Sequence, residues 1–174
     1  MLARNLAVVL VAAMIGGAEA APVSRYALYD SRTNEWCSDY TRVRFEAAVQ
    51  KRQALQVVSL SSENGYPTKL DVTEEGESGD WLVYDTYRFD KTGSLVSANR
   101  IINDVSSQEQ VVESYAIQNG RARKTSSRLN DLSGKPKPGK PEWTPEIAIL
   151  TDYVRTPYYQ LLHGPAQERC IKAK

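Results

Sequence analysis

Two acidic side chains interrupt the apolar faces of expected β-strands, which is a position where a carboxyl group could do acid–base chemistry. Asp85 lies on the apolar face of residues 81–89, and Glu113 interrupts the apolar face of residues 111–118 in the same way. If both point inward, they form a buried polar site together with Arg100. Hydrolysis of a sugar polymer uses two carboxyl groups across a cleft, one with a raised pKa. A carboxylate-based hydrolase is therefore one hypothesis; the alternative is that both acids lie at an edge or pair with arginines.

Aromatic side chains on the same strand faces could line a ligand pocket. Enclosed between the sheet and a helix, they would hold a small apolar ligand. Packed against each other, they would be ordinary cross-strand contacts. The carrier hypothesis predicts a pocket formed by Trp81, Asp85, Tyr87, Glu113 and Tyr115, with Phe89 beside them.

Other catalytic or metal-binding patterns are weak in this chain. His163 is the single histidine, and it directly precedes Gly164-Pro165, where we expect a helix to end. A zinc site or a Ser/Cys–His mechanism would depend on this one residue, and we expect an ordinary surface or helix-terminal histidine. The sequence contains no phosphate-binding loop, dinucleotide fingerprint or calcium loop. We predict no metal and no cofactor; the pattern favours a non-catalytic protein and leaves an enzyme open.

Cys37 and Cys170 are the two cysteines of the chain. In an exported protein an even number of cysteines indicates a disulfide. This bond would close a loop of more than 130 residues. The chain-entropy relation gives about 5 kcal/mol of stabilisation for such a loop, as an upper value.

Residues 1–20 have the pattern of a cleavable signal peptide. Arg4 precedes an apolar run over residues 6–15, and Ala18-Glu19-Ala20 supplies small residues on either side of the cleavage position. The run is shorter than the roughly 20 residues that span a bilayer. No cysteine follows the cleavage position for lipid attachment. We expect a soluble mature protein, cleaved after Ala20 and periplasmic or secreted, with no membrane span.

Charge is unevenly distributed, although the formal net charge is only +1. Residues 63–90 carry eight acidic and two basic side chains, whereas residues 121–140 carry seven basic and one acidic. The near-neutral total argues against a nucleic-acid binder. The two segments either neutralise each other as neighbours, or the basic one contacts an anionic envelope polymer or an acidic protein surface. The candidate contacts are Arg121, Arg123 and Arg128, with Lys135, Lys137 and Lys140 in a Lys/Pro-rich loop at residues 133–143.

The middle of the chain has the pattern of an antiparallel meander. Asn64-Gly65 and Asn119-Gly120 are strong hairpin signals, and residues 77–80 and 90–93 contain further turn residues. The polar last strand suits an exposed sheet edge. The prolines of the loop at 133–143 favour an extended conformation without sheet pairing. The expected strands are residues 55–60, 68–73, 81–89, 95–102, 111–118 and 121–129.

Two helices are expected at the ends of the domain. Residues 33–54 carry apolar side chains at helical spacing, although residues 42–47 alternate as a strand would. Thr144-Pro145-Glu146 is a good helix start, and a further helical turn is expected over residues 158–162.

Together these patterns predict a single α+β domain over residues 21–174. Its twisted antiparallel β-meander would have about five or six strands, with one or two helices packed on one face and the C-terminal helix fastened by Cys170. An all-β, barrel-like variant is the alternative if residues 35–54 are strand. The favoured function is an exported, non-catalytic binding or cell-envelope interaction protein; the alternatives are a small-ligand carrier and, behind it, the hydrolase.

Overall fold

Antiparallel strands account for almost all regular structure in the computed structural model. It describes residues 23–39, 47, 56–76, 78–141, 144–164 and 169–173. The expected signal peptide at residues 1–20 lies outside the described residues. The elements are β1 (Val23–Asp30), β2 (Glu35–Asp39), β3 (Gln56–Glu63), β4 (Tyr66–Glu75), β5 (Trp81–Phe89), β6 (Leu95–Asp104), β7 (Glu109–Gln118), β8 (Arg121–Asp131), α2 (Tyr159–His163) and β9 (Arg169–Lys172).

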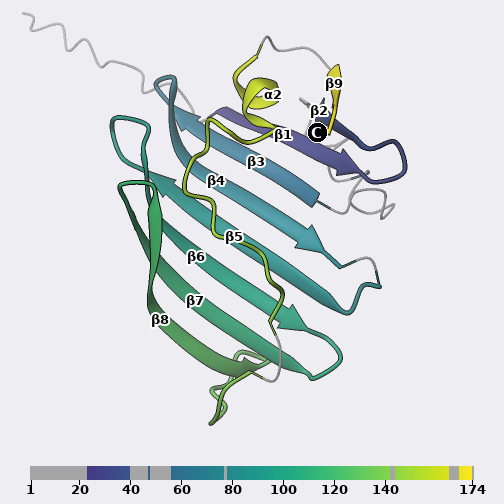
Figure 1. The fold of residues 1–174 in the computed structure, drawn as a ribbon, viewed down its shortest axis with the longest axis vertical. Helices are drawn as coiled ribbons and strands as arrows, with labels where there is room; N and C mark the ends of the chain where they lie inside the picture. Colours follow the sequence, from purple (N-terminus) through teal and green to yellow (C-terminus); the bar gives the residue numbers. More distant parts are fainter. Residues whose placement is uncertain are drawn as a thin grey trace, which may run out of the picture.

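All nine strands belong to one sheet in the order β8-β7-β6-β5-β4-β3-β1-β2-β9 (Figure 1). The six expected strands correspond to β3–β8, which follow one another as a meander. The Asn-Gly turns form as predicted: Asn119 and Gly120 have φ of 51° and 69°, the left-handed conformation that a two-residue hairpin turn requires. The predicted α+β class is nevertheless wrong, because β1, β2 and β9 extend the sheet and the described residues contain no long helix.

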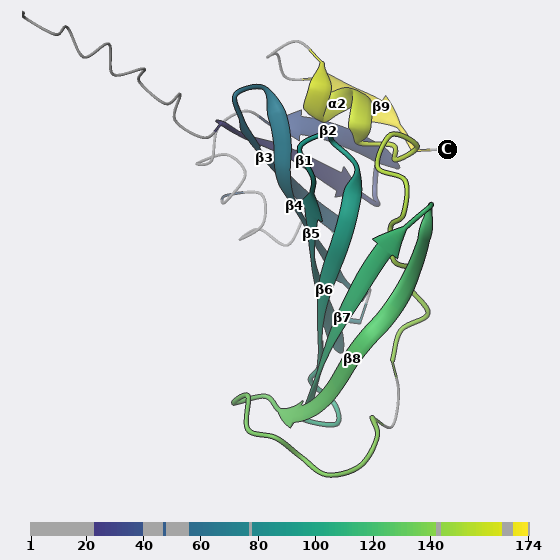
Figure 2. The same ribbon diagram turned by 90° about the vertical axis from the view of Figure 1, so that its left-hand side faces the viewer.

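The C-terminal segment, defined here as residues 144–158, is irregular and not the expected helix. It runs along one face of the sheet from the end of β8 towards α2 beside β1 (Figures 1 and 2). Its backbone finds partners on the sheet: the Ile147 carbonyl accepts from Arg100 and the Leu150 N–H donates to Tyr87. These tertiary hydrogen bonds replace the local ones of a helix, so the sheet contacts override the helix-start signal.

The expected N-terminal helix is also wrong where the structure describes it. Glu35–Asp39 forms β2, which pairs with β1 on one side and β9 on the other. Of residues 40–55 the structure describes only Ala47, so the rest of the expected helix lies outside the described residues. Cys170 therefore fastens a C-terminal strand, and not a helix, to the N-terminal part of the sheet.

Two apolar clusters lie on the inner face, which we define as the sheet face covered by the C-terminal segment. The larger cluster includes Leu60, Leu70 and Tyr87 from the sheet, with Tyr158 and Leu161 from the chain that covers it. The smaller cluster, at the other end of the strands, consists of Val83, Ile102, Val111 and Leu129. A row of charged residues separates the two clusters.

Candidate functional site

The charged row crosses the inner face at right angles to the strands. The sheet register places Asp85 of β5 opposite Arg100 of β6, Arg100 opposite Glu113 of β7, and Glu113 opposite Ser127 of β8. Asp85, Arg100 and Glu113 are all buried. The three residues that the sequence singled out as a buried polar group therefore do lie side by side.

Asp85 and Arg100 form a bidentate ion pair. The Arg100 Nε donates to Asp85 Oδ1 at 2.7 Å and Nη2 donates to Oδ2 at 2.6 Å. The Tyr87 hydroxyl adds a third hydrogen bond to Asp85 Oδ2 at 3.0 Å. Burial raises the pKa of Tyr87, with the Asp85 charge acting in the same direction, so the tyrosine keeps its proton. Asp85 is thus held as an acceptor on both oxygens.

The charged row also positions the C-terminal segment. The Arg100 Nη1 donates to the carbonyl oxygen of Ile147 at 2.5 Å. The Leu150 N–H donates to the Tyr87 hydroxyl at 3.1 Å. Because Arg100 and Tyr87 both hold Asp85, one buried carboxylate organises two attachments of the covering chain.

Glu113 has its own set of partners. It accepts hydrogen bonds from Lys124 Nζ and the Tyr115 hydroxyl, and a longer one from Ser127 Oγ at 3.4 Å. Burial alone would raise the pKa of Glu113, but the hydrogen bonds from Lys124 and Tyr115 outweigh it and hold the pKa below its usual value. Burial and the bond to Glu113 raise the pKa of Tyr115.

This arrangement gives no support to the hydrolase hypothesis. Asp85 and Glu113 belong to strands separated by β6, and Arg100 of β6 lies between them in the sheet register. The lowered pKa of Glu113 is the opposite of what a general acid needs. Asp85 pairs with an arginine, as the alternative expected, whereas Glu113 accepts hydrogen bonds from Lys124 and Tyr115 and from no arginine of the described residues.

The aromatic residues of the predicted pocket do not gather around one described cavity. Tyr87 is buried in the larger cluster, and Tyr115 packs against that cluster's edge. Trp81 packs against the smaller cluster. Phe89 contacts the Tyr153 ring edge-on at 5.3 Å between centroids. The chain that covers them is irregular and is not the expected helix.

The structure instead forms an open groove of about 430 Å³ between β3–β5 and the C-terminal segment. Asp85 and Tyr87 line it, together with Glu74, which the sequence placed in a solvated turn. Glu74 lies on β4, in line with the inner-face residues Leu70 and Val72. Extending the alternation of Leu70 and Val72 by two residues would have predicted that Glu74 also lies on the inner face. Burial raises the pKa of Glu74, while a hydrogen bond from Gln56 partly opposes the shift.

The predicted basic residues lie at the free edge of the sheet. Arg121, Arg123 and Arg128 of β8 pair with Gln118, Ala116 and Val112. These partners alternate with the inner-face residues of β7, so the three arginines point to the opposite, outer face. All three are exposed.

The Lys/Pro-rich loop turns back onto the end of β8, so the prediction of no sheet pairing is wrong. Pro136 bridges to Asn130, and the Lys137 N–H donates to the Leu129 carbonyl at 2.8 Å. Lys137 also pairs with Glu109 at 2.7 Å, whereas Lys135 and Lys140 are exposed. Residues 142 and 143 of the expected loop lie outside the described residues.

The acidic and basic segments are not neighbours. Residues 66–75 and 81–89 form β4 and β5, and β6 and β7 separate them from β8. The basic side chains that do find partners use the β7 carboxylates Glu109 and Glu113. The acidic segment therefore does not neutralise the exposed basic side chains of β8 and the following loop.

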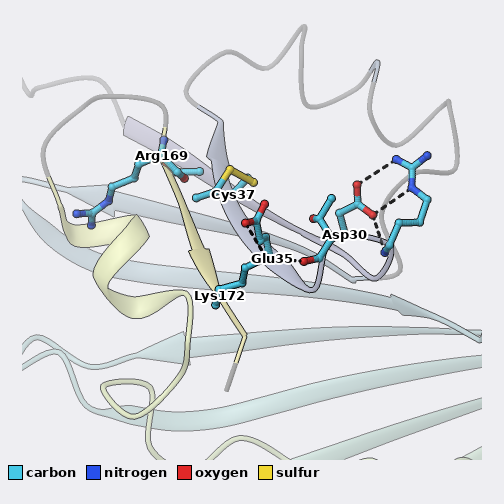
Figure 3. Close-up of a disulfide and its surroundings, with 9 residues drawn as sticks. Asp30, Glu35, Cys37, Arg169 and Lys172 are labelled. Atoms are coloured by element: carbon cyan, nitrogen blue, oxygen red, sulfur yellow. Dashed lines mark hydrogen bonds and ion pairs between the residues drawn. A yellow bond between two sulfur atoms is a disulfide. The ribbon is translucent and has the colours of Figure 1, made fainter.

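The predicted disulfide is confirmed. Cys37 on β2 and Cys170 on β9 are directly opposite in the register and bonded, 133 residues apart in sequence (Figure 3). Next to them, Lys172 pairs with Glu35 at 3.0 Å. Glu35, Cys37 and Cys170 are the one group of close metal-type ligands among the described residues. Both sulfur atoms are in the disulfide, so the group offers no thiolate to a metal.

His163 ends α2, as the sequence predicted for a helix-terminal residue. Its ring packs against Tyr159 at 4.6 Å between centroids. Burial lowers the pKa of His163, and the positive charge of Arg25 adds to the effect. Arg25 itself donates to the carbonyls of Leu162 and Gly164 at the C-terminal end of α2. With five residues, α2 is the longest helix of the described residues and far too short to cross a membrane.

No family model matches this chain, and no curated protein or solved structure is significantly similar to it.

Proposed function

We propose that this protein is an exported, non-catalytic binding protein that contacts an anionic cell-envelope polymer through a basic edge. We define the basic edge as Arg121, Arg123 and Arg128 of β8 with Lys135 and Lys140 of the following loop. The signal-peptide pattern of residues 1–20 supports export. The disulfide is compatible with an oxidising compartment.

The observation that carries the proposal is the lack of ion pairs along this edge. None of the five cations forms an ion pair with any residue that the structure describes, whereas Lys124 and Lys137 beside them are paired with Glu113 and Glu109. The three arginines share one face of one strand, so their charges add along a line. Such a line suits a polyanion whose charges repeat along an extended chain.

The test is co-sedimentation of the mature protein with purified anionic envelope polymers at low and at high salt. Binding should weaken with salt, because exposed charges are screened over about 10 Å at 0.1 M ionic strength. The triple variant R121E/R123E/R128E should abolish binding. A control variant, R32E/R88E/K91E, has the same change in net charge at exposed positions away from β8 and should bind like the wild type.

Equal loss in both triple variants would show that only net charge matters and would refute the basic edge as the contact. Absence of binding at low salt would refute the polymer proposal altogether. Binding to polyglutamate but not to the envelope polymers would instead identify an acidic protein surface as the partner.

A further inference from the structure

The groove beneath the C-terminal segment has one carboxylate that forms no ion pair with the described residues, Glu74. Its floor is formed by side chains of β3, β4 and β5, and residues 147–152 and 155–158 form its other wall. Glu74 lies on the floor, and Gln56 Nε2 donates to its Oε2 at 2.8 Å. No lysine or arginine of the described residues forms an ion pair with it.

The other charges of the groove are already paired. Asp85 is held by Arg100 through two hydrogen bonds. Asp152 pairs with Arg155 at 3.0 Å on the opposite wall. Glu74 is therefore the single negative charge of the groove that a bound cation could neutralise without displacing a protein partner.

The remaining lining is mostly apolar and aromatic. Val72 and Tyr87 contribute from the floor, and Ile149, Leu150, Pro157 and Tyr158 from the covering chain. Tyr87 and Tyr158 are fixed by burial. A ligand with an apolar or aromatic body would bury its surface against these side chains while a positive group reached Glu74.

We propose that the groove binds a small organic cation, with its ammonium group on the Glu74 carboxylate and its apolar body under the C-terminal segment. This site is on the inner face and is independent of the basic edge formed by β8 and the loop that follows it. Burial raises the pKa of Glu74, and the nearby Asp85 charge acts in the same direction; the hydrogen bond from Gln56 and the charge of Arg100 oppose the shift without cancelling it.

The probe is 2-phenylethylamine, with 2-phenylethanol as the neutral molecule of the same shape. Each is titrated into the ¹⁵N-labelled protein with its disulfide intact, and amide shifts are followed by NMR. The amine should bind in the millimolar range or tighter, with the largest shifts at the amides of residues 147–156 and 158, and the alcohol should bind at least tenfold more weakly.

The matched variants are Glu74→Gln and Glu75→Gln. Glutamine keeps the shape of the side chain and an acceptor for Gln56, and the amide spectrum itself reports whether each variant is folded. Amine affinity should fall at least tenfold in E74Q and stay unchanged in E75Q, whose side chain is on the other face of β4. Undetectable amine binding to the wild type, equal affinity in folded E74Q, or shifts away from the C-terminal segment would each overturn the proposal. If E74Q does not fold, equal binding of amine and alcohol by the wild type overturns it.

Discussion

Arg100→Met removes the cation at the centre of the charged row and leaves its partners in place. The side chains of Arg100 and Asp85 are only 4% and 5% exposed. The variant loses two hydrogen bonds to Asp85 and the one to the Ile147 carbonyl. Breaking a buried ion pair by removing one partner costs about 3–5 kcal/mol, because the remaining charge has no compensation. This is about 30–50% of the free energy of unfolding of a protein whose stability is about 10 kcal/mol.

Urea unfolding followed by tryptophan fluorescence measures this loss. The exposed Arg88, on the neighbouring strand, supplies the control: R88M should change the free energy of unfolding by less than about 0.5 kcal/mol. The double variant D85L/R100M replaces both charges by apolar groups, so it should be more stable than R100M alone. In R100M the amide of Leu150 should also exchange its hydrogen faster, because the C-terminal segment loses one of its attachments.

The reasoning is refuted if R100M loses less than about 1 kcal/mol, since a fully desolvated pair cannot be broken so cheaply. It is refuted equally if D85L/R100M is no more stable than R100M. That result would mean that the unpaired Asp85 charge is not the source of the loss.

Three further predictions follow from the disulfide, the Glu113 cluster and one hairpin turn. Replacing Cys37 and Cys170 together by alanine should lower the free energy of unfolding by up to about 5 kcal/mol, measured as a lower urea midpoint. An unchanged midpoint would show that the disulfide contributes nothing to stability. Glu113→Gln should cost about 2 kcal/mol at neutral pH. Because the folded pKa of Glu113 is lowered, its contribution is complete above its ordinary value of 4.5 and is lost as the pH falls through the folded value. The difference between wild type and E113Q in urea midpoint should therefore shrink on acidification below about pH 4.5, and a difference that grows would contradict the assignment. Gly120→Ala should cost about 1 kcal/mol, because Gly120 has a φ of 69°; thermal unfolding followed by circular dichroism measures it, and an unchanged Tm would argue against this turn.

Local sequence patterns located the strands better than the helices. Residues 81–89 and 111–118 alternate over a full strand length, and Asn-Gly steps bound the hairpins, so β3–β8 could be predicted one strand at a time. The helix expected from Thr144-Pro145-Glu146 failed because its backbone partners come from Arg100 and Tyr87, which are distant in sequence. A short stretch of sequence does not include these distant partners, so it cannot predict that their hydrogen bonds outcompete those of a helix.

The candidate site was predictable only as separate residues. Asp85 and Glu113 were recognisable because each breaks an apolar face, and the basic residues because they cluster in sequence. Glu74 was missed, because its neighbour Glu75 and the turn residues after it suggested a solvated stretch. The register between β3, β4 and β5, and the chain that covers them, made it part of a groove.

Three features follow from the amino-acid sequence alone: the alternating strands, the tight turns and the pairing of the two cysteines. The strands and turns depend on the conformational preferences of a few neighbouring residues, and two cysteines allow only one pairing. The tertiary structure alone decided that Asp85, Arg100 and Glu113 form one row and that an irregular segment covers it. It also decided which basic charges remain without a partner in the described chain. These features depend on register and on contacts between residues up to about 60 positions apart, and the free energy of those contacts outweighs the local preference for a helix.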